Sequence, residues 1–166
     1  MGLPGDYIAG LVDGEGCFAL KFRRDVRYDR KNEPVYFYWD IEFVIVLRSD
    51  DKEILEKIQE TLNCGRISVD KRGSARYAVN NIDDLGRLAT FFTTYRLRAK
   101  KQYDFELWKE ALAIFKRNQR LALNRRDGEK GFHKVLWNKN DLRRLKEIRE
   151  QMKKYKGKTN AWKWLK

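Results

Sequence analysis

The sequence predicts an α+β fold in which helices cover one face of a single four-stranded antiparallel sheet. Two pairs of segments alternate apolar and polar residues, which is typical of half-buried strands. Segments with apolar residues at helical spacing precede, separate and follow these pairs. The expected order is therefore αββαββα with an extra C-terminal helix. With 166 residues, of which 42% are hydrophobic, the chain is long enough to bury a core.

The first helix is expected over residues 6–13, where Asp6 caps the N-terminus and Pro4 lies just upstream. Two long alternating strands follow over residues 17–26 and 35–47, joined by a loop at 28–34. Their inward residues are Phe18, Leu20 and Phe22 on the first strand, and Phe37, Trp39, Ile41, Phe43 and Ile45 on the second.

A helix over residues 51–62 is expected next, capped by Ser49 or Asp50 and ended by Cys64-Gly65. Two shorter strands, 66–71 and 75–80, form a hairpin through the turn 71–74. Helices over 82–93, 101–117 and 138–155 complete the fold. The apolar stripe of the second of these, which we assign to the core, is Leu107, Trp108, Ala111, Leu112 and Phe115.

The formal net charge is +13, and most of the surplus lies near the C-terminus: residues 120–166 carry 16 Lys and Arg against 5 Asp and Glu. Such a surplus favours a polyanionic partner, because basic side chains release counterions when they neutralise phosphates. On charge alone, a merely basic soluble protein and a membrane-surface protein stay open. Aromatic residues in the basic tail, Trp162 and Trp164, are expected to pack onto the domain.

The open face of the sheet combines charged, polar and aromatic side chains. A twisted strand ribbon of this kind fits the DNA major groove and can read base edges there, although a merely solvated face has the same pattern. The residues expected to contact DNA are Ala19, Lys21, Arg23, Tyr36, Tyr38, Asp40, Glu42, Arg66, Ser68, Asp70, Arg72, Arg76, Ala78 and Asn80.

Several classes of site and location are excluded by composition. Cys17 and Cys64 lack the spacing of a zinc site, and they are expected to be free intracellular thiols. The single histidine, His133, lies in a loop-like stretch, which excludes a His-clustered metal site and argues against a Ser-His-Asp triad. No apolar run is long enough to span a membrane and no signal segment is present, so we expect a soluble protein that is not secreted.

The run from Ile8 to Gly16 (IAGLVDGEG) combines small residues with two acids at the end of the first helix. Small side chains at helical spacing let a second helix approach closely. Asp13 can then cap a partner helix, while Gly14 and Gly16 allow a sharp exit that brings Glu15 to the edge of the open face. An ordinary helix followed by a glycine-rich turn is the alternative interpretation.

Placed before a basic alternating strand, this run resembles the motif of the LAGLIDADG homing endonucleases. The resemblance implies a core domain at 1–117 with a saddle-shaped sheet, and we assign 118–166 to a basic helical extension of that domain. Because family members with a single motif are homodimers, it also implies two copies of the chain. Their motif helices would meet through Ile8, Ala9, Gly10, Val12 and Asp13.

The activity that this resemblance implies is site-specific cleavage of both DNA strands in a long pseudo-palindromic target, by an intron-encoded enzyme. Glu15 matches the family's acidic metal ligand, and the carbonyl of Gly14 the second protein ligand. The expected metal is Mg²⁺, with Mn²⁺ able to replace it and Ca²⁺ bound without supporting cleavage. The segment Arg98–Lys101 resembles the one that supplies a catalytic cation; Lys100 aligns best and Lys101 next.

One departure from the family concerns the residue that positions water. A glutamine near the end of the second strand has this role in well-known homodimeric relatives, and Leu47 is aligned with it here. The family's basic residue one turn later is aligned with Asp51. Arg48 is the residue that could substitute in space.

Alternative functions on the same fold are an intron-splicing maturase that binds RNA and a nucleic-acid-binding protein that does not cleave. The intact acid at Glu15 argues against a pure binder. A generic basic interaction protein would leave the motif unexplained. The expected location is intracellular, in a bacterial or archaeal cytoplasm or in an organelle such as a chloroplast or mitochondrion.

Overall fold

A computed structural model describes residues 2–26, 28–29, 31–32, 35–123 and 137–155. The predictions made for His133, Trp162 and Trp164 lie outside these residues, as do those for the side chains of Tyr36 and Phe37. The chain forms two compact units, Met1–Gln102 and Tyr103–Lys166. A boundary at 117/118 stays a prediction, and a single helix runs through that position.

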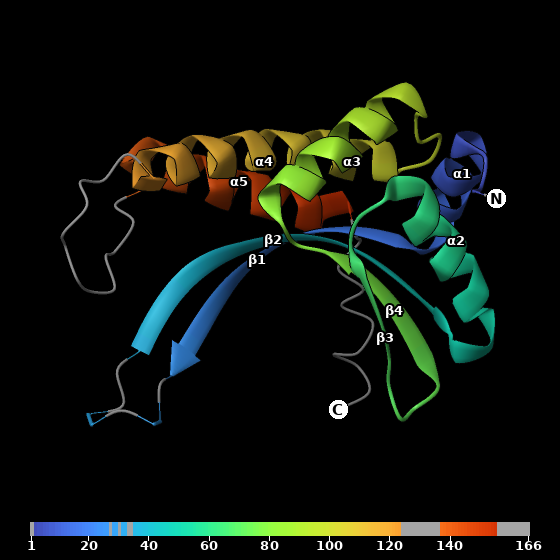
Figure 1. The fold of residues 1–166 in the computed structure, drawn as a ribbon. Coiled ribbons are helices and arrows are strands. Elements are labelled where there is room, and N and C mark those ends of the chain that lie inside the picture. Colours follow the sequence, from blue (N-terminus) through green and yellow to red (C-terminus); the bar gives the residue numbers. More distant parts are fainter. Residues whose placement is uncertain (1, 27, 30, 33–34, 124–136, 156–166) are drawn as a thin grey trace, which may run out of the picture. The chain divides into compact units, whose positions relative to one another are not determined.

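The first unit contains the whole sheet and three α-helices (Figure 1). Its elements are α1 (Gly5–Glu15), β1 (Gly16–Val26), β2 (Val35–Arg48), the 3₁₀ turn η1 (Ser49–Asp51), α2 (Lys52–Leu62), β3 (Arg66–Val69), β4 (Ser74–Val79) and α3 (Ile82–Thr94). The strands pair antiparallel in the order β1-β2-β4-β3. The predicted fold class and element order are confirmed.

The sheet is arched, and α1, α2 and α3 lie on its convex side, as Figure 1 shows. Three aromatic rings join this side of the sheet to α3. Phe18 of β1 lies 5.1 Å from Phe43 of β2, and each lies 5.6 Å from Phe92 of α3, measured between ring centroids. All three side chains are buried. Packing on one side leaves the concave side of the sheet open within this unit.

The inward assignment of Phe22 was wrong, because this side chain is 47% exposed. The last buried pair of the β1–β2 ribbon on the convex side is Leu20 opposite Ile41. Beyond it, Phe22 faces Trp39 in the register, and their ring centroids lie 5.1 Å apart. The two rings therefore pack on each other at a point where the ribbon has left the core.

The predicted cap of α2 was also wrong. Neither Ser49 nor Asp50 caps the helix, because both belong to η1, and the N-cap residue is Asp51, which makes no side-chain capping bond. The carboxylate of Asp50 instead pairs with Arg48, with an N–O distance of 2.8 Å. At the other end, Asn63 closes α2 in the left-handed conformation, just before the predicted Cys64-Gly65.

Gly65 combines a left-handed backbone conformation with close packing against its neighbours. Its φ is +82°, and an added Cβ would lie 2.6 Å from the buried ring of Tyr77 and 2.8 Å from Val79. We expect Gly65→Ala to lower the free energy of unfolding by roughly 2–5 kcal/mol, combining left-handed strain with overpacking. Urea denaturation measures this loss.

Gly73→Ala is the matched control for this prediction. Gly73 also has a positive φ, +86°, but the nearest atom to an added Cβ is the Ser49 hydroxyl at 3.8 Å. Only the conformational cost applies there, about 1–2 kcal/mol. Equal losses in the two variants would contradict the contact that we assign to Gly65.

The second unit contains most of α4 (Lys101–Leu123) together with α5 (Lys139–Tyr155). Arg144 of α5 donates to both oxygens of Glu110 in α4, at 2.6 and 2.8 Å. Asp141 receives a hydrogen bond from Asn118 at 2.9 Å and pairs with Arg117. Of the predicted stripe on α4, all but the half-buried Leu107 are buried.

None of the described helices is long and apolar enough to cross a membrane.

Candidate active site and DNA-facing surface

The motif helix α1 has one buried side and one open side. Ile8, Ala9 and Val12 are at most 3% exposed, and the helix packs on β1 and β2. Gly10 and Gly14 lie on the opposite side, where an added Cβ would meet no atom within 4 Å. Together with the exposed Tyr7 and the half-buried Leu11 they follow the spacing of one helical stripe. We call these four residues the open stripe.

Three of the predicted interface residues are buried within the chain itself. Ile8, Ala9 and Val12 point into the chain's own core and present no side chain to a partner, whereas Gly10 does lie on the open side. Tyr7 and Leu11 complete the open stripe but were not among the predicted interface residues. Their spacing from Gly10 and Gly14 was the signal that could have found them, because residues three and four apart share a helix face.

Glu15 is the last residue of α1 and its side chain is exposed. Gly16, which follows it, is already the first residue of β1 and pairs with Ile45 of β2. The acid therefore stands where the motif helix passes into the sheet. The carbonyl of Gly14 belongs to the last helical turn, where backbone oxygens lack partners within the helix.

A lysine from a distant part of the chain donates hydrogen bonds to these unpaired backbone oxygens. The Lys101 ammonium donates to the carbonyl oxygens of Asp13 at 3.0 Å and Gly14 at 2.8 Å. The Asp13 carboxylate in turn accepts hydrogen bonds from the backbone N–H groups of Arg98 at 2.6 Å and Ala99 at 3.2 Å. These contacts fasten the segment 98–101 to the end of the motif helix.

The two lysines of the predicted segment thus have different positions. Lys101, the second choice of the alignment, contacts the motif helix, while the side chain of Lys100 is exposed. Asp13 was expected to cap a partner's helix, but its carboxylate is engaged by its own chain. A sequence pattern gives no direct signal for this contact, since the bonded residues are 85 positions apart.

The position aligned with the water-positioning glutamine lies on the wrong side of the sheet for that role. Leu47 pairs with Ala75, which is buried on the convex side. Its neighbour Arg48 is highly exposed and paired with Asp50. Asp51, aligned with the family's basic residue, is the N-cap of α2. Leu47 therefore has neither the chemistry nor the orientation to order water over the open face.

The register places the described strand residues predicted to contact DNA on the concave side of the sheet, opposite one another on neighbouring strands. Asp70 and Arg72 belong to the connection between β3 and β4, and Asn80 follows β4. Their exposure varies. Arg23, Tyr38, Arg66, Ser68, Asp70, Arg72 and Asn80 are exposed; Lys21, Asp40, Arg76 and Ala78 are half-buried; Ala19 and Glu42 are buried. The Asp70 carboxylate accepts N–H bonds from Arg72 and Ser74, both at 2.9 Å, and so shapes the hairpin turn.

Carboxylates partly neutralise the cations of this surface. Asp40 pairs with Arg23 at 2.9 Å. Glu42 hydrogen-bonds Lys21 through one oxygen and Arg76 through the other, the latter at 3.0 Å. Burial on its own raises the pKa of the Glu42 carboxyl. The hydrogen bonds and charges of Lys21 and Arg76 outweigh burial, and the pKa lies below its usual value.

Within the described part of the chain, no three His, Cys, Asp or Glu side chains converge as a metal cluster would require. Burial raises the pKa of the Cys64 thiol, which keeps it protonated and unreactive.

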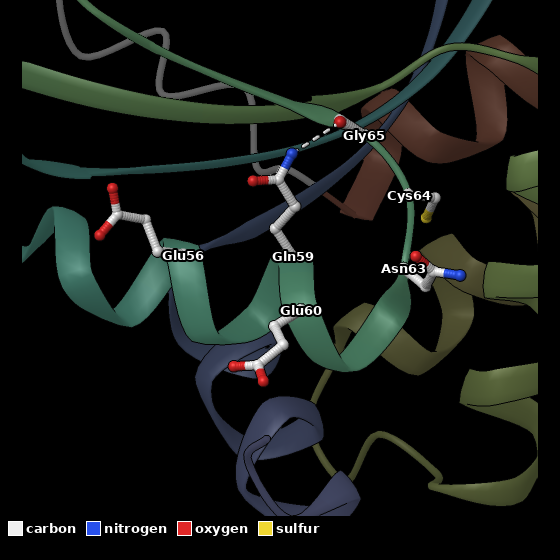
Figure 2. Close-up of a pocket in the computed structure, with 6 residues that line it drawn as sticks. All are labelled: Glu56, Gln59, Glu60, Asn63, Cys64 and Gly65. Carbon is white, nitrogen blue, oxygen red and sulfur yellow. Dashed lines mark hydrogen bonds between the residues drawn. The ribbon is translucent and has the colours of Figure 1, made fainter. Parts of the chain in front are cut away.

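A pocket beside α2 is lined by Glu56, Gln59, Glu60, Asn63, Cys64 and Gly65 (Figure 2). Its two carboxylates disfavour phosphate, so we do not assign it to DNA.

Oxygen donors at the end of α1 fit a hard divalent cation. The Glu15 carboxylate and the Gly14 carbonyl are the ligand types that such ions prefer. Lys101 already donates to the Gly14 carbonyl, but a carbonyl oxygen has a second lone pair. One chain offers two of the six ligands that Mg²⁺ requires, which leaves room for water, DNA phosphates and a second copy.

The sequence matches the model of the LAGLIDADG endonuclease family over residues 8–112, more than half of the chain. The chain belongs to this family. A curated relative, the probable intron-encoded DNA endonuclease 1 of Mycosarcoma maydis, is 35% identical over 80 residues. That match covers 48% of this chain and 26% of the relative, so the chain spans about a quarter of the length of the curated relative it matches.

Solved LAGLIDADG structures have the same fold. The homing endonuclease I-TnaI superposes with a TM-score of 0.68 at 23% identity, covering 93% of this chain and 97% of that one. The meganuclease I-AabMI, bound to uncleaved DNA, gives 0.63 at 27% identity, with 88% and 43% covered. I-SmaMI, bound to uncleaved DNA in the presence of calcium ions, gives 0.67 at 22% identity, with 90% and 45% covered.

Proposed function

We propose that this LAGLIDADG protein is a site-specific endonuclease that hydrolyses both strands of a pseudo-palindromic DNA target as a homodimer. The observation that carries the proposal is the exposed Glu15 at the junction of α1 and β1, next to the Gly14 carbonyl that Lys101 contacts. From this junction β1 leads directly onto the basic concave side of the sheet. An acid, a cation and a basic strand surface are thereby joined in one unit.

Glu15 and the Gly14 carbonyl are the groups that we expect to hold the metal. Bound there, Mg²⁺ would activate water and neutralise charge on the phosphate undergoing attack. We expect Mn²⁺ to replace Mg²⁺, and Ca²⁺ to permit binding without cleavage. The remaining steps fall to the protein. The concave side would position the DNA, and Lys101, whose ammonium contacts the Gly14 carbonyl, is the cation that we expect to stabilise negative charge on phosphate.

Two features support the proposed homodimer, namely the incomplete site and the open stripe. One chain supplies one Glu15, whereas two strands must be cut. Gly10 and Gly14 offer a surface without side chains at which a second α1 can approach closely. Two copies related by this contact would bring both acids near the symmetry axis, in keeping with the self-complementary contact of a two-fold dimer.

Selection from a plasmid library with a randomised insert tests the function against many candidate targets at once. Incubation in Mg²⁺ should linearise a subset of plasmids that share one pseudo-palindromic sequence, and sequencing of the ends should show short 3′ overhangs. A protein that enriches a sequence by binding yet linearises none would be a non-cleaving binder. Preferential binding of a structured RNA from its own intron would favour the maturase.

The two lysines give a sharper test of the site. We expect Lys101→Met to lower the single-turnover cleavage rate by roughly 100-fold while leaving DNA affinity within a few-fold, because the cation acts on charge that develops during reaction. Lys100→Met is the matched control, since it removes the same charge one residue away from an exposed side chain. If Lys100→Met lowers the cleavage rate and Lys101→Met does not, the catalytic cation is Lys100.

A further inference from the structure

We infer that Glu42 is a specificity-positioning residue: it fixes the conformations of Lys21 and Arg76 on the DNA-facing side of the sheet and does not itself contact bases. The inference rests on the proposed function, because it assumes that this side of the sheet receives DNA. It replaces the expectation that Glu42 belongs to the residues in contact with DNA.

The position of Glu42 excludes it as a reader of bases. A glutamate can recognise cytosine by accepting a hydrogen bond from its exocyclic amine, which requires an accessible carboxylate. The Glu42 side chain is only 8% exposed, and its two oxygens are already bonded to Lys21 and Arg76. Its neighbour Asp40, by contrast, is 29% exposed and has one cationic partner.

The register explains how two long side chains converge on one carboxylate. Glu42 lies in the central strand β2, opposite Ala19 of β1, and Lys21 is two residues further along β1. Arg76 reaches from β4 on the other side, past Ala78. Ala19 and Ala78 have short side chains, which leave space on the concave side of β2. Lys21 and Arg76 reach Glu42 through this space and cover its carboxylate, while each side chain stays 42% exposed.

A basic side chain that is held in one conformation recognises DNA differently from one that can move. Arginine has five N–H donors in a rigid fork, and one nitrogen of Arg76 is held by Glu42, so the others can face an acceptor in a defined direction. A free arginine or lysine would instead follow the nearest phosphate and bind every sequence equally. Fixing side chains before binding also lowers the entropy lost on binding.

The net charge of the three side chains shows what removal of Glu42 does. Lys21, Arg76 and Glu42 together carry +1, whereas a Glu42→Gln variant carries +2 at the same place. The added free charge strengthens contact with any phosphate backbone and increases the salt dependence of binding. Glu42 therefore opposes non-specific binding while it supports specific contacts.

The test compares full-length wild type with Glu42→Gln on DNA duplexes. Wild-type protein first enriches its preferred sequence from a pool of randomised duplexes in EDTA, where no cleavage intervenes. Affinities for that duplex and for the unselected pool are then measured by gel shift over a range of salt. We expect Glu42→Gln to lower the ratio of specific to non-specific affinity by about tenfold. We also expect tighter, more salt-dependent binding to the unselected pool.

Two further variants isolate the effect. Glu53→Gln makes the same charge change on an exposed residue of α2 whose carboxylate pairs with Lys57 at 2.7 Å, and it should leave the affinity ratio unchanged. In an Arg76→Ala background, Glu42→Gln should lose most of its effect on the ratio, because the main side chain that it positions is absent. Should Glu42→Gln fail to fold, Glu42→Asp carries the test, since it keeps the charge but withdraws the oxygens from both cations.

An affinity ratio within twofold of wild type in folded Glu42→Gln would overturn the inference, and so would a parallel loss of specific and non-specific binding. If wild type enriches no sequence at all, the proposed function fails instead. The two failures are therefore separable.

Discussion

Glu15→Gln should lower DNA cleavage by roughly 1,000-fold or more while specific DNA binding persists, because several kcal/mol of transition-state stabilisation depend on the metal that this carboxylate is proposed to hold. A neutral amide is a much poorer ligand for a hard cation. The substitution is nearly isosteric, and the Glu15 side chain is exposed, so the fold of α1 should be retained.

Binding by Glu15→Gln in the absence of metal should be equal to wild type or tighter. Two like charges near the dimer axis disappear with the substitution, and each lies close to DNA phosphates in the proposed complex. Gel shifts and a cleavage assay at equal protein concentration measure both effects. Glu53→Gln serves as the control for charge. Cleavage by Glu15→Gln at a rate near that of wild type would refute the metal assignment.

Gly10→Leu should convert the homodimer into a folded monomer and abolish double-strand cleavage. An added Cβ at Gly10 meets no atom of its own chain within 4 Å, so we expect the monomer to accept the side chain on the open side of α1. Leucine is also a better helix former than glycine, by about 0.8 kcal/mol. A leucine between two closely packed helices, however, would force their backbones apart.

Light scattering measures the first part of this prediction directly. Wild type should have about twice the chain mass of 19.9 kDa, and Gly10→Leu should have the chain mass itself. Thr90→Leu adds a leucine at an exposed position of α3 and should stay dimeric and active. A dimeric, active Gly10→Leu would show that the open stripe is not the interface.

Periodicity predicted most of the fold because its signals are repeated many times. The strands β1 and β2 alternate over more than ten residues each, so one misplaced residue cannot change the assignment. Features that depend on a single contact have no repeated signal, and there the predictions failed. Whether Phe22 is buried depends on the point at which the β1–β2 ribbon leaves the core. Asp50 does not cap α2, and its carboxylate forms an ion pair with Arg48.

The candidate site was predictable to the extent that one segment carries it. The motif predicted a helix that ends at Asp13 with Glu15 just after it, whereas in the structure α1 continues to Glu15 as its last residue. The alignment leaves the positions of Lys100 and Lys101 uncertain by one residue, and in the structure it is Lys101 that contacts the motif helix. The bonds of Asp13 to Arg98 and Ala99 join positions that only the folded unit brings together.

The contact between the motif helix and segment 98–101 has a consequence for protein synthesis. Glu15 leaves the ribosome early, but Lys101, which binds the carbonyls of Asp13 and Gly14, is added almost ninety residues later. Until then these two carbonyls lack their cation, and Asp13 lacks its two N–H partners. A nascent or prematurely terminated chain that ends before residue 98 therefore carries the motif helix without the segment that is fastened to its end.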